Sequence, residues 1–340
     1  MKIAVLGAGA FGTVIANLVA HNGHPTHLWL RDKTQLKTLL ETRESSRYLP
    51  NLKLERLVTP TGDLQTAVST AELIFVTVPS ASFREVTRQA ATYAQDGSYV
   101  ISCTKGVEQV GLDFRLMSQI LEEEISHCEI GVISGPNLAI EIAQGQIAGT
   151  VIASKNNTLI RVIQECMQSN RFRIYGSNDV FGVELGGALK NIYAIICGMA
   201  DALQIGQNSL SMIITRSLAE MSRFAAKMNA NPATFLGLAG VGDLMATCTS
   251  PDSRNFKLGH AIASGLTVDE AMSKLGKLAE GVNTLSVIYQ KTKDLGLSMP
   301  LVEALYHVLF NGADISRKIV ELMTSAQDVD VEFSVAVEDN

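Results

Sequence analysis

One lysine lies inside a long and mostly apolar stretch of the chain. Residues 182 to 201 read GVELGGALKNIYAIICGMAD, with Lys190 near the middle and Asn191 directly after it. Burying an unpaired ammonium costs several kcal/mol or forces the amine to become neutral. Chance alone is therefore a poor account of Lys190, which makes it a candidate functional residue. The structural alternative is a lysine whose aliphatic stem covers the core while its charged end reaches water.

Polar residues also stand at the carboxyl ends of predicted strands. Lys105 follows one strand in CTKG, and Pro79 and Ser80 follow another in VTVPS. A third strand, IGVI, is followed by SGPNLA, whose Gly-Pro turn exposes backbone amides. Open α/β sheets bind ligands outside the carboxyl ends of their strands. We therefore expect Lys105 to hold an anionic or carbonyl-bearing substrate; the alternative is a surface lysine in a loop.

A third group of candidate residues suggests a phosphate site. The segment GLAGVGDLMATCTSPDSRNFKLG has three glycines before Asp243, and Ser253, Arg254 and Asn255 stand where a new helix would begin. A serine at the helix start, an arginine fork and open backbone amides together suit a phosphate. The alternative is a capped helix on the surface.

The N-terminal glycines form a motif that is typical of dinucleotide sites. Gly7, Gly9 and Gly12 follow the strand KIAVL and open the helical pattern FGTVIANLVAHNG. In such a motif the first glycine permits the tight turn, the second lets the backbone approach a pyrophosphate, and the third lets helix and strand pack closely. The helix amides then face the anion. We therefore expect a dinucleotide here; the alternative is a close-packed turn without a ligand.

The end of the second strand bears on which dinucleotide binds. It reads Trp29-Leu30-Arg31-Asp32, with an arginine where NAD-specific folds commonly carry an acid that binds the ribose hydroxyls. Arg31 suits a 2′-phosphate, whereas Asp32 favours the unphosphorylated ribose. The interpretation favours NADP(H), with NAD(H) still possible; a solvated Arg-Asp loop is the alternative.

Two kinds of element are expected to position these residues. The first half alternates short β-branched runs with helical patterns, which is typical of a parallel sheet, and the second half contains long helical segments. We expect an α/β Rossmann-like N-terminal domain followed by an all-α C-terminal domain. The expected boundaries are 1–178 for the dinucleotide-binding domain, 179–326 for the helical substrate and catalytic domain, and 327–340 for a loose acidic tail.

Composition excludes several classes of function. The net charge is −6, and the last thirteen residues contain five acids and no base, so no nucleic-acid partner is expected. The N-terminus lacks the features of a signal peptide, which predicts a cytoplasmic protein. The longest strongly apolar stretch, Ile192 to Ala200, is shorter than the roughly 20 residues that span a bilayer, so no membrane span is expected. The histidines and five scattered cysteines show no metal-ligand spacing, so no metal site is expected.

Seven short runs of the sequence together resemble one known family. GAGAFGT, TKG, SGPNLA, LGGALKN, AGVGDL, TCTSPDSRN and AEGVNT occur in the order and approximate spacing of the NAD(P)-dependent glycerol-3-phosphate dehydrogenases of bacterial type. The resemblance extends over nearly the whole chain, to about residue 322. LGGALKN and CTSPDSRN are specific to that family, whereas GAGAFG is not.

The resemblance implies a role for individual residues. Lys190 would be the proton donor and acceptor, and Lys105 and Arg254 would each touch both substrate and cofactor. The implied substrate-binding residues are Lys105, Gly135, Asn137, Lys190, Asp243, Ser253, Arg254 and Asn255. The implied cofactor-binding residues are Gly7, Gly9, Ala10, Phe11, Gly12, Arg31, Lys105, Ala139, Arg254, Leu278 and Glu280. The chain departs from many relatives at Ala10, Phe11 and Asn137, which affects single hydrogen bonds rather than the reaction.

The implied reaction gives Lys190 a chemical task. Hydride transfer from NAD(P)H to the C2 carbonyl of dihydroxyacetone phosphate yields sn-glycerol 3-phosphate only if the oxygen also receives a proton. Lys190 would supply it from within about 3 Å, with burial and neighbouring cations favouring the neutral amine that takes the proton back. Asp243 would orient the ammonium or bind a substrate hydroxyl, and Asn191 would fix a substrate oxygen or a backbone turn. The family implies a homodimer that supplies phospholipid synthesis.

Two readings from other classes stay open on the sequence alone. Gly186 and Lys190 also fit the GxxxK arrangement of 3-hydroxyacid dehydrogenases, although a carboxylate substrate would not need the full phosphate site around Arg254. A dinucleotide-sensing protein without turnover is the second alternative. It would have no reason to place Lys190 and Asp243 together.

Overall fold

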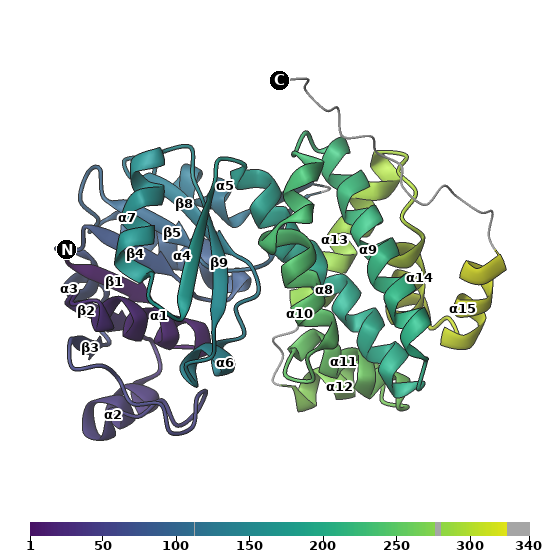
Figure 1. Cartoon of the computed structure of the whole chain (residues 1–340), viewed down its shortest axis with the longest axis horizontal. Coiled ribbons are helices and arrows are strands. Elements are labelled where there is room, and N and C mark those ends of the chain that lie inside the picture. The colour runs from purple at the N-terminus through teal and green to yellow at the C-terminus, as the bar shows by residue number, and fades with distance from the viewer. Residues whose placement is uncertain (112, 276–279, 325–340) are drawn as a thin grey trace. The chain divides into compact units, whose positions relative to one another are not determined.

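The chain forms two compact units. A computed structural model describes residues 1–111, 113–275 and 280–324, shown as ribbon in Figure 1. The first unit comprises Met1–Glu108 and Arg115–Glu184, and the second comprises Gln109–Phe114 and Leu185–Asn340. This division falls inside one long helix, so the domain boundary expected after residue 178 stays a prediction.

The first unit is built on an eight-stranded sheet within the described residues (Figure 1). Its strand order is β10-β9-β8-β5-β4-β1-β2-β3, and all neighbouring pairs are parallel except β8 and β9. The expected parallel sheet is therefore confirmed apart from that one antiparallel pair. The strands are β1 (Ile3–Leu6), β2 (Thr26–Trp29), β3 (Val58–Thr61), β4 (Leu73–Val76), β5 (Tyr99–Ser102), β8 (Glu129–Ser134), β9 (Ala148–Ala153) and β10 (Phe172–Ser177).

Helices cover both faces of this sheet. Along β1, Ile3 and Val5 join one hydrophobic cluster and Ala4 and Leu6 join another, because successive side chains of a strand point to opposite faces. Helices α1, α2 and α7 contribute to the first cluster, and α3, α4 and α5 to the second. The helices are α1 (Ala10–His21), α2 (Lys33–Thr42), α3 (Leu64–Val68), α4 (Ser80–Ala91), α5 (Met117–Glu124), α6 (Ala139–Ala143) and α7 (Asn157–Met167).

Two strands of the sheet were not expected from the sequence, and both lie at its edges. β3 contains Pro60, a residue that argues against a central strand but is tolerated at an edge. At the other edge, side chains form hydrogen bonds with backbone groups of β10. Gln164 Nε2 donates to the Ile174 carbonyl at 3.1 Å, and the Phe172 amide donates to Ser169 Oγ at 3.0 Å. These contacts leave less of the β10 backbone open to pairing with another chain. A separate hairpin pairs β6 (Val107–Val110) with β7 (Asp113–Leu116).

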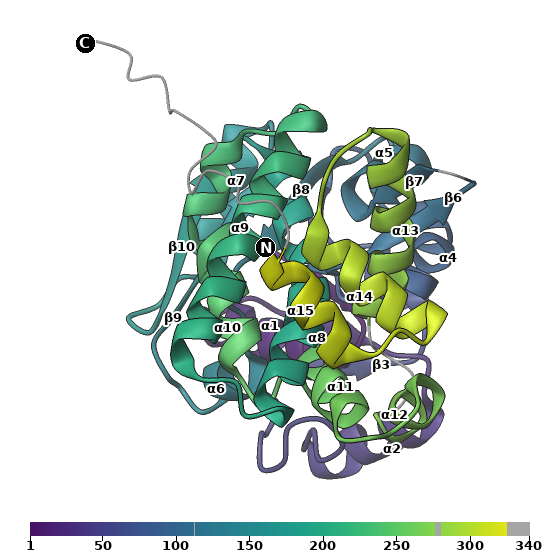
Figure 2. The ribbon, with the colours of Figure 1, turned by 90° about the vertical axis from the view of Figure 1, so that its right-hand side faces the viewer.

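The second unit is helical, as the sequence predicts. Helix α8 packs closely on α11 through two glycines: a Cβ on Gly198 would lie 2.0 Å from the Phe256 carbonyl oxygen, and one on Gly259 would lie 1.8 Å from that of Ile195. Helix α15 packs beside α14 (Figure 2). The elements are α8 (Val180–Ala202), α9 (Gln207–Lys227), the 3-10 turn η1 (Pro232–Leu236), the π turn η2 (Leu238–Gly242), α10 (Asp243–Thr249), α11 (Arg254–Ala263), α12 (Val268–Lys274), α13 (Glu280–Asp294), α14 (Pro300–Asn311) and α15 (Ile315–Thr324).

Helix α8 is longer than the apolar stretch considered in the sequence. The helix has 23 residues, and an 18-residue window of it has a mean hydropathy of 1.4, which by length and composition alone would allow it to cross a membrane; no other described helix meets that test. However, 83% of the tested window is buried inside the structure. Such burial is what the core helix of a globular domain shows.

A buried carboxyl group connects three helices of the second unit through hydrogen bonds. Glu220 of α9 accepts hydrogen bonds from the Tyr193 hydroxyl at 3.1 Å and from the backbone amides of Leu301 and Val302 at 2.7 and 3.4 Å. The two amides belong to the first turn of α14, which otherwise has no side-chain cap among the described residues. Burial raises the pKa of Glu220 from 4.5 to about 7.

This shift predicts a pH-dependent loss of stability. Because the folded state holds the proton more tightly than the unfolded state, the stability from protonated Glu220 is present below pH 4.5 and is lost as pH rises through 7. The loss is at most about 3 kcal/mol. Relative to Glu220→Gln, the wild-type free energy of unfolding should therefore fall between pH 5 and pH 8 in denaturant titrations. A difference between the two proteins that does not change with pH would contradict this assignment.

Candidate functional site

The glycine motif forms a tight turn between β1 and α1. Gly7 has a φ of +118°, which side chains rarely tolerate, and a Cβ on Gly12 would lie 2.0 Å from the Gly7 carbonyl oxygen. Thr77, which follows β4, stabilises the turn because its hydroxyl donates to the carbonyls of Leu6 and Gly7 at 3.0 and 2.8 Å. The geometry fits the packing roles expected of Gly7 and Gly12. Thr77 was not identified from the sequence.

The start of α1 suits an anion. A Cβ on Gly9 would meet no atom within 4 Å, so the backbone faces open space there. Gly9 is also the N-cap of α1, and no side chain from the described residues caps its first amides. Open amides at the start of a twelve-residue helix attract negative charge, so the turn fits the pyrophosphate of a dinucleotide.

The expected cofactor residues of the first unit gather around this helix. Ala10 and Phe11 form the first turn of α1 and are partly buried. Helix α6, which begins at Ala139, packs against α1. Arg31 follows β2 and is exposed, with a long 3.8 Å contact to Glu85. Leu278, which was also expected at the cofactor, lies outside the described residues. The expected acidic tail, residues 327–340, lies outside them as well.

Lys105 and Gly135 meet at the carboxyl edge of the sheet. They follow the neighbouring strands β5 and β8, and Lys105 Nζ donates to the Gly135 carbonyl at 2.7 Å. Asn137 is held by its amide nitrogen, which donates to Thr150 Oγ1 at 2.9 Å. Two buried oxygens here, Asn137 Oδ1 and Ser134 Oγ, have no hydrogen-bond partner among the described residues. Both oxygens therefore retain the capacity to accept a hydrogen bond, which buried polar atoms nearly always use.

Lys190 is buried and paired in the second unit. Only 6% of the residue is exposed, and its ammonium donates to Asp243 Oδ1 and, at 2.7 Å, to Thr247 Oγ1. Asp243 is 1% exposed. Its carboxylate stabilises the charged ammonium, which fits the first of the two roles expected of Asp243, that of orienting the ammonium. The structural alternative for Lys190, with its charged end in water, does not hold.

The glycines of LGGALKN explain how the pair forms. A Cβ on Gly186 would lie 2.5 Å from the carbonyl oxygen of Ala239, so the absence of a side chain lets η2 approach α8. The turn η2 leads directly into α10, which begins at Asp243. Thr247 lies one helical turn later on the same face of α10. The spacing of four residues shows that Thr247 shares a face with Asp243, but not that this face meets Lys190.

The predicted phosphate segment starts α11. Ser253 is the N-cap and accepts a hydrogen bond from the Phe256 amide at 3.3 Å, and the exposed Arg254 is the first helical residue. Asn255 is buried instead: its Oδ1 accepts from the Gly281 amide at 3.1 Å.

The contact at Gly281 links the phosphate segment to the lysine helix. Gly281 follows Glu280, the first residue of α13. A Cβ on Gly281 would lie 2.7 Å from the Asn191 carbonyl oxygen and 2.8 Å from Asn255 Oδ1. The starts of α11 and α13 therefore meet α8 next to Lys190. This places Ser253, Arg254, Asn255, Glu280 and the Lys190 pair in one part of the second unit.

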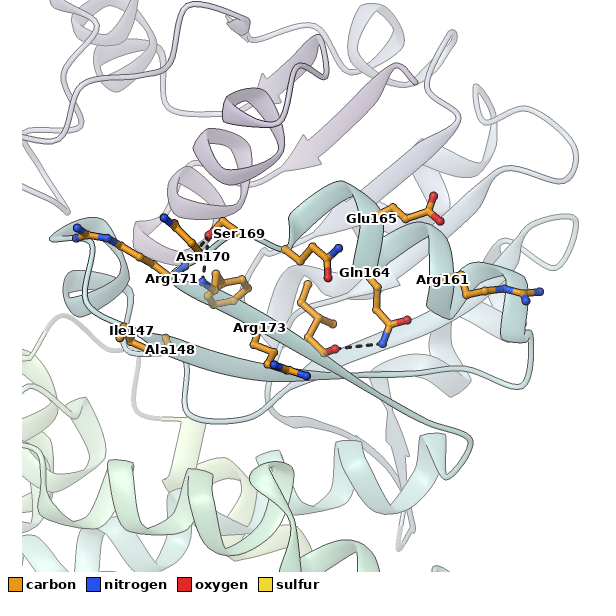
Figure 3. Close-up of a pocket in the computed structure, with 12 residues that line it drawn as sticks. Ile147, Ala148, Arg161, Gln164, Glu165, Ser169, Asn170, Arg171 and Arg173 are labelled. Carbon is orange, nitrogen blue, oxygen red and sulfur yellow. Dashed lines mark hydrogen bonds between the residues drawn. The ribbon is translucent and has the colours of Figure 1, made fainter.

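A hollow of about 710 Å³ lies elsewhere on the first unit, along β9, α7 and β10 (Figure 3). It is lined by Arg161, Arg171 and Arg173 among others, and none of the predicted site residues borders it. Figure 3 shows Arg161 and Arg171 at opposite ends of the hollow, so their charges do not converge. Among the described residues no group of three acidic, histidine or cysteine side chains could hold a metal ion. The expectation of no metal stays a prediction.

Two family models match the chain. The model described as NAD-dependent glycerol-3-phosphate dehydrogenase N-terminus matches residues 2–160, and the model of the C-terminus of the same enzyme matches residues 179–320. The chain belongs to this family. The sequence resemblance is thereby confirmed, as is the prediction of an NAD(P)-dependent oxidoreductase.

Individual relatives agree with the family models. The chain is 51% identical to the glycerol-3-phosphate dehydrogenase (NAD(P)+) of Azotobacter vinelandii over 97% of this chain and 96% of the relative. The enzyme of the same name from Pseudomonas entomophila is also 51% identical, with the same coverage. The crystal structure of glycerol-3-phosphate dehydrogenase from Coxiella burnetii has a TM-score of 0.90 and 32% identity, covering 95% of this chain and 99% of that one. The predicted fold class is thus confirmed for this family member.

Proposed function

We propose that this family member reduces dihydroxyacetone phosphate to sn-glycerol 3-phosphate with NAD(P)H and catalyses the reverse reaction. The buried Lys190, paired with Asp243 and Thr247, carries the proposal. A buried ammonium supported in this way suits proton transfer to a carbonyl oxygen. The role proposed for residues 1–178 is dinucleotide binding. The role proposed for residues 179–326 is substrate binding and catalysis.

Lys190 serves as the general acid and base. The bound cofactor supplies or accepts the hydride at the C2 carbon of the substrate. The ammonium of Lys190 gives a proton to the C2 oxygen during reduction, and the neutral amine takes that proton back during oxidation. Asp243 keeps the nitrogen charged before reduction, and Thr247 fixes its direction. Proton transfer of this kind requires the nitrogen within about 3 Å of the oxygen.

The remaining residues hold the two ligands. For the substrate, the start of α11 with Ser253 and Arg254 binds the phosphate, and the unpartnered oxygen of Asn137 suits a hydroxyl. The full proposed substrate set is Lys105, Gly135, Asn137, Lys190, Asp243, Ser253, Arg254 and Asn255. The full proposed cofactor set is Gly7, Gly9, Ala10, Phe11, Gly12, Arg31, Lys105, Ala139, Arg254, Leu278 and Glu280.

Removing Arg254 should weaken recognition of the phosphate specifically. Arg254→Ala is expected to raise KM for dihydroxyacetone phosphate about tenfold to a hundredfold, because a charge-assisted pair of hydrogen bonds is lost. With unphosphorylated dihydroxyacetone and saturating NADPH, which offsets the loss of the cofactor contact proposed for Arg254, the variant should match the wild type. Lys257→Ala is the matched control, since Lys257 is exposed one turn later on α11 and contacts Asp252 instead. Equal losses on both substrates would place Arg254 outside the phosphate site.

A single assay distinguishes this function from the two other classes. NADPH oxidation is followed with dihydroxyacetone phosphate, with a 3-oxoacid carrying a carboxylate, and without substrate. Turnover with the phosphorylated ketone alone supports the proposal. Turnover with the oxoacid alone would indicate a hydroxyacid dehydrogenase, and dinucleotide binding without any turnover would indicate a sensor.

We further propose a cytoplasmic homodimer that supplies glycerol 3-phosphate for phospholipid synthesis. Support for this comes from the family resemblance alone. Light scattering on the purified full-length chain measures its mass directly, and a monomer at micromolar concentration would contradict the homodimer.

A further inference from the structure

Both carboxylate oxygens of Asp32 are engaged by the protein. Oδ1 accepts hydrogen bonds from the amides of Thr34 and Gln35 at 2.9 and 3.0 Å and so caps α2. Oδ2 accepts from Arg47 Nη1 at 2.7 Å. In NAD-specific folds an acid in this region accepts the ribose hydroxyls instead. Here the helix and Arg47 compete with a ribose for Asp32.

This cluster adjoins the glycine turn. Gln35, in the first turn of α2, donates from Nε2 to the carbonyl of Ala8 at 2.7 Å. Ala8 lies between the two glycines that shape the expected pyrophosphate site. Arg31 directly precedes Asp32 in the chain and Arg47 contacts Asp32, so both arginines are candidates for the region where the adenosine ribose of a dinucleotide would lie.

The guanidinium of Arg47 can change partners at small cost. Its side chain is 59% exposed and that of Asp32 is 42% exposed, and an ion pair this open to water contributes little to stability. The guanidinium also lies 5.3 Å from the centre of the Tyr48 ring, which supports its flat face. Arginine forks bind phosphate through two parallel hydrogen bonds. A dianionic phosphate would therefore be a stronger partner than the exposed carboxylate.

We propose that Arg47, together with Arg31, binds the 2′-phosphate of NADP(H), and that its contact with Asp32 disfavours NAD(H). Arg47 is thus a residue that determines cofactor specificity, 15 positions beyond the strand end where the sequence directs attention. The inference rests on the proposed dinucleotide site and does not depend on the identity of the ketone substrate.

Binding of two small nucleotides tests the assignment. Adenosine 2′,5′-bisphosphate reproduces the ribose phosphate of NADP(H), and 5′-AMP lacks the 2′-phosphate. Calorimetry on the full-length chain should show that Arg47→Ala weakens the bisphosphate about tenfold and leaves 5′-AMP unchanged. Arg31→Ala should behave in the same way. Lys37→Ala is the matched control, because Lys37 lies on α2, the helix that Asp32 caps, is 75% exposed and contacts Glu41 at 3.8 Å.

The outcomes separate the possibilities. Unchanged bisphosphate binding in Arg47→Ala, equal loss of both nucleotides, or a wild type that does not distinguish them would each overturn the proposal. Asp32→Asn gives a second test, since asparagine caps helices as well as aspartate does but carries no charge. It should bind the bisphosphate at least as tightly as the wild type, and weaker binding would contradict the role given to Arg47.

A kinetic measurement connects the proposal to turnover. Arg47→Ala should raise KM for NADPH and lower KM for NADH, because Asp32 becomes available to the ribose hydroxyls. The nucleotide-binding experiment needs no turnover, so it can fail while the dehydrogenase assay succeeds. The reverse is equally possible, which keeps the two proposals distinguishable.

Discussion

Lys190→Ala is expected to lower kcat for reduction of dihydroxyacetone phosphate by about a hundredfold to ten-thousandfold, the usual contribution of a positioned general acid. The loss should be in kcat more than in KM, because the proton is needed in the transition state. Rapid-mixing measurements with NADPH and NADH should show the same loss, since the cofactor's phosphate is not involved. Near-normal turnover in a folded Lys190→Ala protein would remove the lysine from the mechanism.

That variant needs a control for folding, because it leaves Asp243 buried without its ammonium. Asp243 is 1% exposed, and an unpaired buried charge destabilises strongly. The double variant Lys190→Met with Asp243→Asn removes both charges at similar volume. It is expected to recover most of the stability lost by the single variant and none of the activity. Recovery of activity along with stability would show that Lys190 is structural.

Asp243→Ala is expected to cost about 3–5 kcal/mol of stability, because it leaves the ammonium of Lys190 buried without its carboxylate. Denaturant unfolding followed by circular dichroism measures this loss. Activity should also fall, since the amine then favours its neutral form and gives up no proton to the ketone.

The milder change Asp243→Asn separates the two roles of this residue. An amide keeps a hydrogen-bond acceptor for Lys190 but removes the charge, so stability should fall less than in Asp243→Ala. If Asp243 keeps Lys190 charged, Asp243→Asn should have a lower kcat for ketone reduction than the wild type, even where both proteins are fully folded. Unchanged kcat in a folded Asp243→Asn protein would limit Asp243 to a packing role.

The sequence predicts those parts of the structure that depend on local chemistry. Gly7 and Gly12 are identifiable because only glycine permits the turn and the close helix contact that the structure shows. Lys190 is identifiable because a charged residue is costly in an apolar helix. The change from strands to helices follows from the change in hydrophobic period along the chain.

The remaining features depend on contacts between distant residues. Nothing in the local sequence indicates that Thr247 meets Lys190 or that Arg47 meets Asp32, because both contacts form only when separate elements pack. Asn255 looks like a ligand-binding amide, yet its oxygen also holds the start of α13 through Gly281. β3 was missed because Pro60 suggests a loop until the strand is known to lie at an edge.

In the proposed mechanism, Lys190 transfers the proton to and from the C2 oxygen. A crystal structure of the full-length chain with NADP+ and sn-glycerol 3-phosphate tests it most directly. We predict that Lys190 Nζ lies within about 3 Å of the C2 hydroxyl oxygen while keeping its contact with Asp243. A nitrogen turned away from that oxygen, with another side chain or water in its place, would exclude Lys190 as the proton donor.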